Sequence, residues 1–195
     1  MTQATRIARG LVDRVRGREA SAATVLTRAA RRWPQSLGVI DDDGALTLAE
    51  LHEQVRELAG ALHARGIRQG STVALLCHHH AGLVEAALAT LWVGAEPRLL
   101  GPDVDHTQLT DLARRRRPDL LVHDAALLDV VRRADLGITT LVSDAHGSGS
   151  VTAARSFGHP APRPGRAGHA SLEGSVLASA LTEIGAGRPV VLRRA

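Results

Sequence analysis

The chain has 195 residues, of which 44% are hydrophobic and only 2% aromatic, and its formal net charge is +4. This length suits one domain, or slightly more, with a core of Leu, Val, Ile and Ala. All 24 basic residues are arginine, and the lack of lysine excludes a Walker P-loop, a Schiff base and a catalytic ammonium group.

The single cysteine excludes an internal disulfide. The sequence also shows no signal segment and no apolar stretch of about 18 residues, the length a membrane-spanning helix needs. We therefore expect a cytoplasmic protein with no transmembrane segment. The scarcity of aromatic residues argues against modules that stack nucleic-acid bases on aromatic rings.

The first 34 residues predict two short amphipathic helices, over residues 5–17 and 21–34. We expect these helices to pack on the domain rather than to lie on a membrane. Residues 37–47 then place two apolar runs around Asp42, Asp43 and Gly44, which is typical of a β-hairpin. The adjacent acids favour a solvated turn over a cation site, because further oxygen ligands at EF-hand spacing are missing.

Residues 47–66 carry the clearest helix signature. Thr47 and Glu50 form a capping box, and Gly66 supplies the C-terminal stop. The run that follows, residues 71–77, is continuously apolar and bounded by turn residues. Such a run predicts a strand buried on both faces of a parallel sheet.

Strand and helix then alternate along the chain. Helices are predicted over residues 81–94, 106–118 and 125–135, and strands over residues 95–100, 119–124 and 138–143. This alternation predicts an α/β fold: a mainly parallel sheet with helices on both faces, plus the small hairpin. In such open sheets, ligands bind beyond the carboxyl ends of the strands.

Composition divides the chain into four parts. Residues 1–34 hold the N-terminal helices and residues 35–143 the α/β subdomain. Residues 144–170 are rich in Gly, Pro and Ser and predict a flexible segment. Residues 171–195 predict a last helix and a short strand.

The sequence from Cys77 to His80 places the only cysteine beside three consecutive histidines. Neighbouring side chains in a strand or loop point in different directions, and zinc ligands are usually spaced by two or more residues, so a polar loop is favoured over a metal site. The loop precedes a helix N-terminus, where a histidine could meet a phosphate or carboxylate. His78, His79 and His80 are therefore the candidate substrate-binding residues. We expect no metal ligand, no cofactor-binding residue and no catalytic residue in this chain.

A basic run, Arg114 to Arg117, ends the helix over residues 106–118. A solvated helix end, where cations complement the last carbonyl groups, is the favoured interpretation. Binding of nucleic acid through this run alone would be nonspecific and sensitive to salt. No GxSxG elbow frames a serine, so a hydrolytic triad is unsupported.

From about residue 20 to residue 143 the sequence resembles the N-terminal part of the adenylate-forming (AMP-binding) acyl-CoA synthetases. "GALTLAELHEQVRELAGALHARGIRQGSTVALL" resembles the first core motif of that family, and "LATLWVGAEPRLLGPD" stands in the place of the second. Within the family, "CHHHAGLVEA" at residues 77–86 and "LLVHD" at residues 120–124 are most similar to fatty-acyl-CoA synthetases of high-GC bacteria. The resemblance assigns the Cys77 to His80 stretch to a loop at a strand end.

The sequence departs from the family pattern in ways that bear on catalysis. Leu48 replaces the usual Tyr, and the phosphate-binding Thr-Ser-Gly-Thr-Thr-Gly-x-Pro-Lys-Gly loop, which should follow residues 187–192, is absent. The Thr-Glu that helps hold magnesium, the ribose-binding Asp and the C-terminal domain with its Lys are absent as well. Adenylation needs a cradle for the phosphates and magnesium. The resemblance implies ATP, Mg²⁺ and CoA for the family, but we expect no cofactor for this chain alone.

Three hypotheses follow. The favoured one is a truncated or degenerate fatty-acyl-CoA synthetase-like ligase that is not catalytic alone. The second is a binding or assembly module that pairs with a complementary synthetase chain, or with a second copy of itself, through an open sheet edge. The third, a binder of nucleic acid or of an acidic surface, is least favoured, because acids interleave the arginines and no specific nucleic-acid reading element is visible.

Overall fold

Strands and helices alternate in the computed structural model, which describes residues 21–143 and 176–192. The predicted helix over residues 5–17 and the predicted flexible segment over residues 144–170 lie outside the described residues. The elements are α2 (Ala22–Arg32), β1 (Leu37–Asp41), β2 (Gly44–Thr47), α3 (Leu48–Ala64), β3 (Thr72–Leu76), α4 (Ala81–Trp92), β4 (Glu96–Leu100), α5 (His106–Arg116), β5 (Leu120–Asp124), η1 (Ala125–Leu127), α6 (Leu128–Ala134), β6 (Thr139–Ser143), α8 (Val176–Gly185) and β7 (Val190–Val191).

Four strands form the larger sheet, in the order β4-β3-β5-β6, and every neighbouring pair is parallel. Leu76 at the end of β3 pairs with Leu100 of β4 on one side and with His123 of β5 on the other. The central strands β3 and β5 are almost completely buried, as the apolar run of β3 predicts, although β5 ends in His123 and Asp124. The carboxyl ends of the four strands therefore meet at one edge of the sheet.

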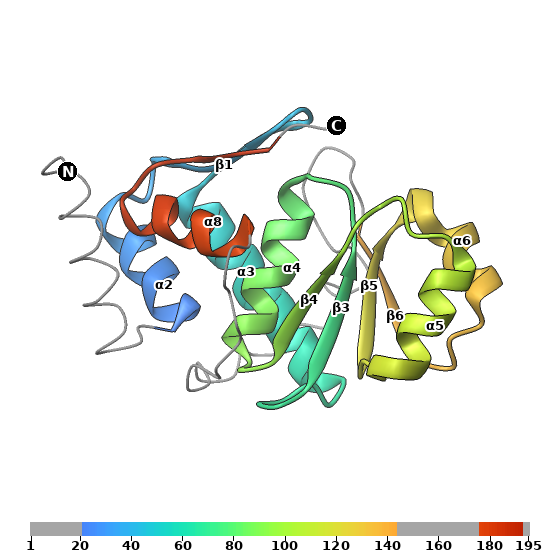
Figure 1. Ribbon diagram of the computed structural model, residues 1–195. Helices are drawn as coiled ribbons and strands as arrows, with labels where there is room; N and C mark the ends of the chain where they lie inside the picture. The colour runs from blue at the N-terminus through green and yellow to red at the C-terminus, as the bar shows by residue number, and fades with distance from the viewer. Residues whose placement is uncertain (1–20, 144–175, 193–195) are drawn as a thin grey trace, which may run out of the picture.

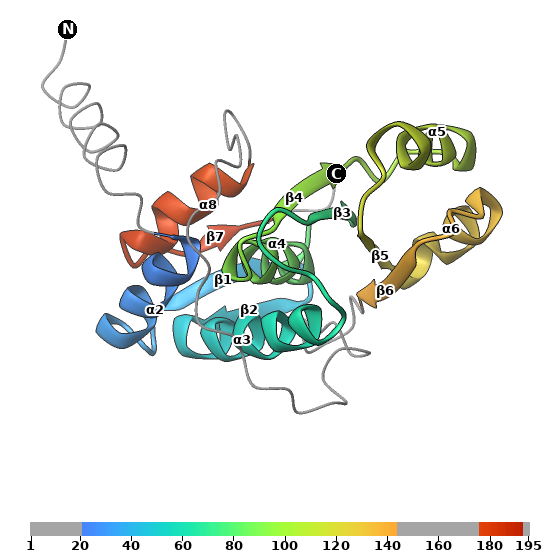
Figure 2. The same ribbon diagram turned by 90° about the horizontal axis from the view of Figure 1, so that it is seen from below.

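Helices cover both faces of this sheet, as predicted. Figure 1 shows α3 and α4 on one side and α5 and α6 on the other, with α2 and α8 packed outside α3 and α4. The view from below in Figure 2 shows the same separation of the two helical layers. The core between the sheet, α3 and α4 is the larger one, and a smaller core lies under α5 and α6.

The predicted hairpin belongs to a second, three-stranded sheet with the order β2-β1-β7. β1 and β2 pair antiparallel, and β7 pairs parallel with β1 through Val39 and Val190. The last strand thus joins the hairpin rather than the larger sheet. In Figure 1 this small sheet lies across the end of α3 and α4.

Capping residues fix several helix boundaries. The predicted capping box of α3 is present: the Thr47 side chain accepts from the Glu50 N–H, and the Glu50 carboxylate accepts from the Thr47 N–H. α5 and α6 end in left-handed residues that are not glycine, Arg117 and Asp135, each with φ 42°. No helix in the described ranges is long and apolar enough to cross a membrane.

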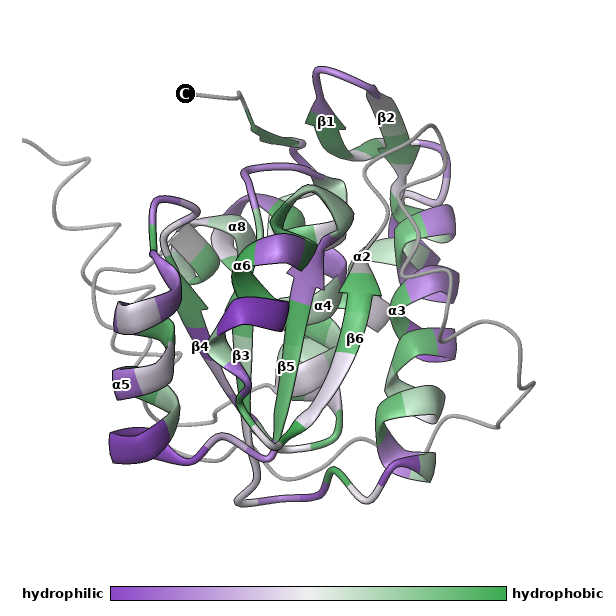
Figure 3. Ribbon diagram, turned by 90° about the vertical axis from the view of Figure 1, so that its right-hand side faces the viewer, coloured by the Kyte–Doolittle hydropathy of each residue, from purple (hydrophilic) through white to green (hydrophobic). Residues whose placement is uncertain are grey.

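Figure 3 shows that the strands of the larger sheet are mainly hydrophobic, whereas the outer turns of α5 are strongly hydrophilic. The two helical layers are therefore not equivalent. α4 is buried along most of its length, but α5 buries only Leu109. The α4 side of the sheet is therefore enclosed, whereas α5 on the other side presents most of its side chains to solvent.

Candidate active site at the carboxyl edge

The polar residues at the carboxyl edge of the larger sheet come from β3, β5 and the β1–β2 hairpin. The loop from Cys77 to His80 follows β3 and leads into α4, for which His80 is the N-cap residue. Asp124 is the last residue of β5, the strand next to β3. Because parallel strands end at the same edge, the fold brings these two segments into contact.

Asp124 holds two of the three candidate histidines. One carboxylate oxygen, Oδ2, accepts from the His78 backbone N–H at 2.7 Å and lies 2.6 Å from His78 Nδ1. The other oxygen, Oδ1, lies 2.7 Å from His80 Nε2. An ionised carboxylate only accepts, so both ring nitrogens carry the hydrogen. We call Asp124, His78 and His80 the Asp124 cluster.

The Asp124 cluster is mostly buried and keeps its carboxylate ionised. The side chains of Asp124 and His80 are 4% and 3% exposed, whereas that of His78 is 42% exposed. Burial alone raises the pKa of Asp124, but the hydrogen bonds from the His80 ring, the His78 backbone and the His78 ring outweigh it and lower the pKa from 3.8 to about 2. The cluster therefore contains a carboxylate throughout the physiological pH range.

Cys77 is buried beside this cluster and is not a reactive thiol. Its Sγ lies 3.9 Å from the Val122 carbonyl oxygen of β5. Burial, together with the negative charge of Asp124, raises the pKa of the Cys77 thiol well above its ordinary value. A protonated, enclosed thiol is a poor metal ligand and a poor nucleophile.

The side chain of Asp41, the last residue of β1, lies at the N-terminus of α4. Its Oδ1 accepts from the N–H groups of Asp43 and Gly44 at 3.0 Å each, which closes the hairpin turn. Its Oδ2 accepts from the Ala81 N–H at 2.7 Å, the first N–H of α4. The side chain thus serves as a distant cap and fills the position at which an anionic ligand would bind.

A third imidazole, His123, lies on the opposite face of β5. Its Nδ1 donates to the Asp124 carbonyl oxygen at 2.8 Å. In the described part of the chain its Nε2 is buried without a hydrogen-bond partner. His123 is fully buried and, as the residue before Asp124 on β5, faces the other side of the sheet from the Asp124 side chain.

These contacts decide which of the predicted binding residues lie together. His78 and His80 meet on Asp124, while His79 between them is exposed. The structure thus recruits two of the three histidines as donors to an internal carboxylate. Among residues 21–143 and 176–192, no group of three or more His, Cys, Asp and Glu side chains has the arrangement of a metal site.

The described residues do not fit the triphosphate of ATP or its magnesium ion. The α4 N–H that would face a phosphate is bound to Asp41, and the imidazole N–H groups of the cluster are bound to Asp124. A phosphate at this edge would meet the carboxylates of Asp41 and Asp124 instead of these donors. No reaction step is therefore assigned to this group of residues.

Sequence reasoning missed Asp41 and Asp124, the two residues that organise the edge. The hairpin prediction assigned the turn to Asp42, Asp43 and Gly44, but Asp41 accepts both turn hydrogen bonds. The available signal was position, because each of the two acids ends a predicted strand. Asp124 ends the strand next to β3, which leads into the histidine loop, and Asp41 ends the first strand of the hairpin. Acids at strand ends are therefore the residues in which to seek contacts with this loop.

Comparison with known proteins identifies relatives of this chain. The family model described as AMP-binding enzyme matches residues 26–168. A 3-[(3aS,4S,7aS)-7a-methyl-1,5-dioxo-octahydro-1H-inden-4-yl]propanoyl:CoA ligase of Rhodococcus jostii is 32% identical over 58% of this chain and 22% of its own length. Salicyl-AMP ligase / salicyl-S-ArCP synthetase of Mycobacterium tuberculosis is 39% identical over 40% of this chain and 15% of its own length.

Solved structures share the fold at low identity. A benzoate CoA ligase from Burkholderia xenovorans superposes with a TM-score of 0.67 and 20% identity, over 76% of this chain and 30% of that one. O-succinylbenzoate coenzyme A synthetase from Bacillus subtilis, in complex with AMP, superposes with a TM-score of 0.68 and 17% identity, over 87% of this chain and 55% of that one. The N-terminal domain of FACL13 from Mycobacterium tuberculosis superposes with a TM-score of 0.62 and 19% identity, over 74% of this chain and 38% of that one. The chain spans less than a quarter of the length of the Rhodococcus jostii CoA ligase and of the salicyl-AMP ligase.

Proposed function

Because the chain belongs to the family of AMP-binding enzymes, we propose that it forms the N-terminal scaffold of an AMP-forming ligase and does not adenylate a substrate alone. We further propose that the acid activated by the complete ligase is a fatty acid. The substrate proposal is supported by residues 77–86 and 120–124, which resemble fatty-acyl-CoA synthetases. CoA would be the acyl acceptor.

The observation that carries the scaffold proposal is the self-occupied carboxyl edge. Asp41 binds the first N–H of α4, and Asp124 binds the donors of His78 and His80. Adenylation requires free backbone N–H groups and cations that stabilise the phosphate charge as pyrophosphate leaves. The 195 residues contain no lysine and no Gly-rich phosphate loop. In the proposed ligase, the groups that bind the ATP phosphates are therefore supplied by residues outside these 195.

ATP–pyrophosphate exchange tests the proposal directly. The purified chain is assayed with magnesium, ATP and a panel of acids that includes a long-chain fatty acid, benzoate and salicylate. We expect no exchange above the blank with any acid. A robust exchange by the chain alone would refute the scaffold proposal.

The same assay then tests the substrate proposal. A second polypeptide that carries the Gly-rich loop, the ribose-binding Asp and the C-terminal Lys is added to the chain. We expect exchange to appear, and to be fastest with the fatty acid. Exchange that is restored but is fastest with an aromatic acid would leave the scaffold proposal intact and refute the substrate proposal.

The alternative is an assembly module that pairs with a separate chain or with a second copy of itself. It is favoured by the small sheet, which carries the two exposed large hydrophobic side chains of the described residues, Leu37 at 42% and Val191 at 57%. Val191 lies on β7, at the edge of that sheet. Co-purification from the native host, followed by measurement of the molar mass, tests this alternative. Recovery of a monomer without a partner would contradict it.

A further inference from the structure

The fold brings two arginine-rich helix ends to the same side of the molecule. α5 leads from β4 to β5 and α6 leads from β5 to β6, so each helix runs back from the carboxyl edge of the sheet to its amino edge. The two helices pack on each other through a small apolar core that includes Leu109 and Val131. The Thr110 hydroxyl donates to the Ala134 carbonyl oxygen at 3.0 Å, which ties the end of α6 to the side of α5.

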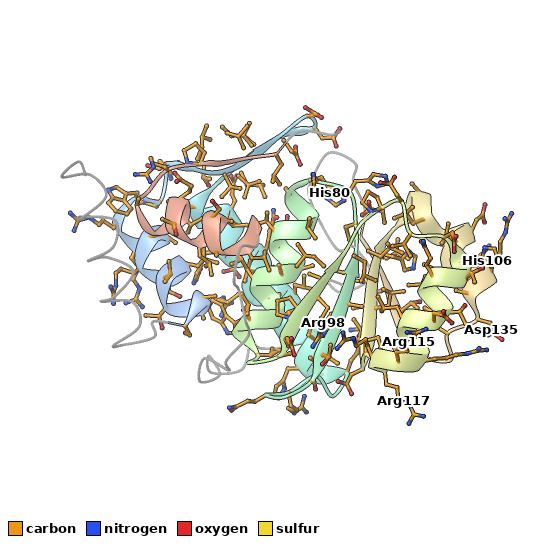
Figure 4. All side chains as sticks on the ribbon, viewed as in Figure 1. His80, Arg98, His106, Arg115, Arg117 and Asp135 are labelled. Atoms are coloured by element: carbon orange, nitrogen blue, oxygen red, sulfur yellow. The ribbon has the colours of Figure 1, made fainter. Side chains whose placement is uncertain are left out.

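Six arginines gather at these ends, and all of them are exposed. The last turn of α5 contributes three and its C-cap a fourth, and the last turn of α6 contributes two. Figure 4 shows Arg115 and Arg117 at the lower end of α5, away from the Asp124 cluster, where His80 is labelled. We call this surface the basic end: Arg114, Arg115, Arg116, Arg117, Arg132 and Arg133.

The acids near the basic end compensate only part of its charge. Arg115 lies 3.7 Å from Asp111, and both side chains are more than half exposed, so this pair contributes little. Asp119 directs its carboxylate to the Thr72 N–H at 2.7 Å. Asp129 lies one turn before Arg132 and Arg133 on α6, and Asp135 follows that helix. Four acids therefore stand against six arginines.

Capping of the two helices does not account for so many cations. A helix C-terminus is stabilised by one or two positive side chains in its last turn, and the effect does not extend beyond that turn. Further arginines on neighbouring helix ends repel one another and destabilise the compact state. An anionic surface placed against them would remove this repulsion.

We propose that the basic end docks the protein onto an anionic phospholipid surface. The charges are spread over the last turns of two helices that pack on each other, so they can meet several phosphates of a lipid surface at once. α5 and α6 contain no Phe, Trp or Tyr on which bases could stack, and the arginines lie at the ends of the helices rather than along a face that would enter a groove. Docking is electrostatic and reversible, because the six residues offer no apolar side chain for insertion. The inference does not depend on the proposed function.

Co-sedimentation with vesicles tests the docking surface. The full chain is mixed with vesicles of phosphatidylcholine alone or of phosphatidylcholine with phosphatidylserine. Two triple variants carry the same change of charge: Arg114→Gln, Arg116→Gln and Arg133→Gln at the basic end, and Arg28→Gln, Arg31→Gln and Arg32→Gln on α2. All six positions are exposed, and circular dichroism checks that both variants keep the fold of the parent chain.

The expected result is binding to the vesicles that contain phosphatidylserine only, lost at high salt. Each arginine at an anionic surface contributes about fivefold to partitioning, so the basic-end variant should bind roughly 100-fold more weakly, and the α2 variant should bind much more like the parent. An equal loss in both variants would overturn the proposal, since net charge alone would then explain binding. Absence of binding to anionic vesicles, or tighter binding to RNA or DNA that depends on the same arginines, would overturn it too.

Discussion

Asp124→Asn replaces the carboxylate of the Asp124 cluster by an amide of nearly the same size. The amide oxygen can still accept from the His78 N–H, and its NH₂ group can face His80 once the imidazole shifts its hydrogen to the other nitrogen. The change therefore removes a titrating group while it disturbs the packing little. Asp124→Ala, in contrast, leaves the buried ring donor of His80 and the part-buried donors of His78 without an acceptor.

The magnitude follows from the lowered pKa of Asp124. A carboxyl group whose pKa is about 2 in the folded chain, against 3.8 ordinarily, stabilises the fold above pH 3.8 and loses that contribution as the pH falls toward 2. The difference corresponds to about 2 kcal/mol of unfolding free energy. At neutral pH the parent chain should exceed Asp124→Asn by about this amount, and the gap should close between pH 4 and pH 2. Asp124→Ala should be less stable than Asp124→Asn by a further 1–3 kcal/mol or so at every pH.

Urea unfolding, followed by circular dichroism at a series of pH values, measures these differences. Asp103→Asn is the control, because it neutralises an exposed carboxylate in the loop between β4 and α5. Its unfolding free energy should follow that of the parent chain across the whole series. If the curves of the parent and of Asp124→Asn stay parallel from pH 7 to pH 2, the hydrogen bonds to Asp124 do not lower its pKa, and the account of the cluster is wrong.

Further substitutions test other parts of the structure by the same unfolding measurement. Asp41→Ala should cost about 2–3 kcal/mol, because it removes the acceptor of both the hairpin turn and the first N–H of α4. Gly187→Ala should cost about 3 kcal/mol, since a Cβ there would lie 2.7 Å from the Trp33 ring at a φ of 72°. Gly137→Ala, with φ 62° and nothing within 4 Å of the added Cβ, should cost only about 1 kcal/mol. Arg117→Gly should raise stability by about 0.5–1 kcal/mol, because glycine adopts the left-handed cap of α5 without strain, and a loss of stability would contradict this reading.

The sheet and its helices were predictable from the sequence because their signals are local and periodic. The capping box of Thr47 and Glu50 and the apolar run of β3 each fix an element without reference to the rest of the chain. The pairing of β7 with β1 carries no such signal, since two short apolar strands fit either sheet. The packing of α8 on α2, which places the following strand near β1, is shown only by the structure.

The site was less predictable for a related reason. The three histidines are conspicuous in the sequence, but their roles depend on Asp124, which lies 46 residues beyond His78. A run of polar residues in the sequence predicts a polar loop. It does not reveal whether the hydrogen-bond donors of that loop face a ligand or an acceptor within the protein. Likewise, the sequence shows the four arginines at the end of α5, but only the structure shows that α6, with two more, packs against that helix.

The pairing of Val39 with Val190 has a consequence for the order of events during synthesis. All four strands of the larger sheet have been translated by residue 143, so that sheet and its helices can assemble while later residues are still being added. The hairpin must wait for β7, with one edge unprotected and open to wrong pairing until then. A ribosome that pauses between these two points would therefore display a folded sheet beside an unfinished one, and the unfinished one is the part that would need protection by a chaperone.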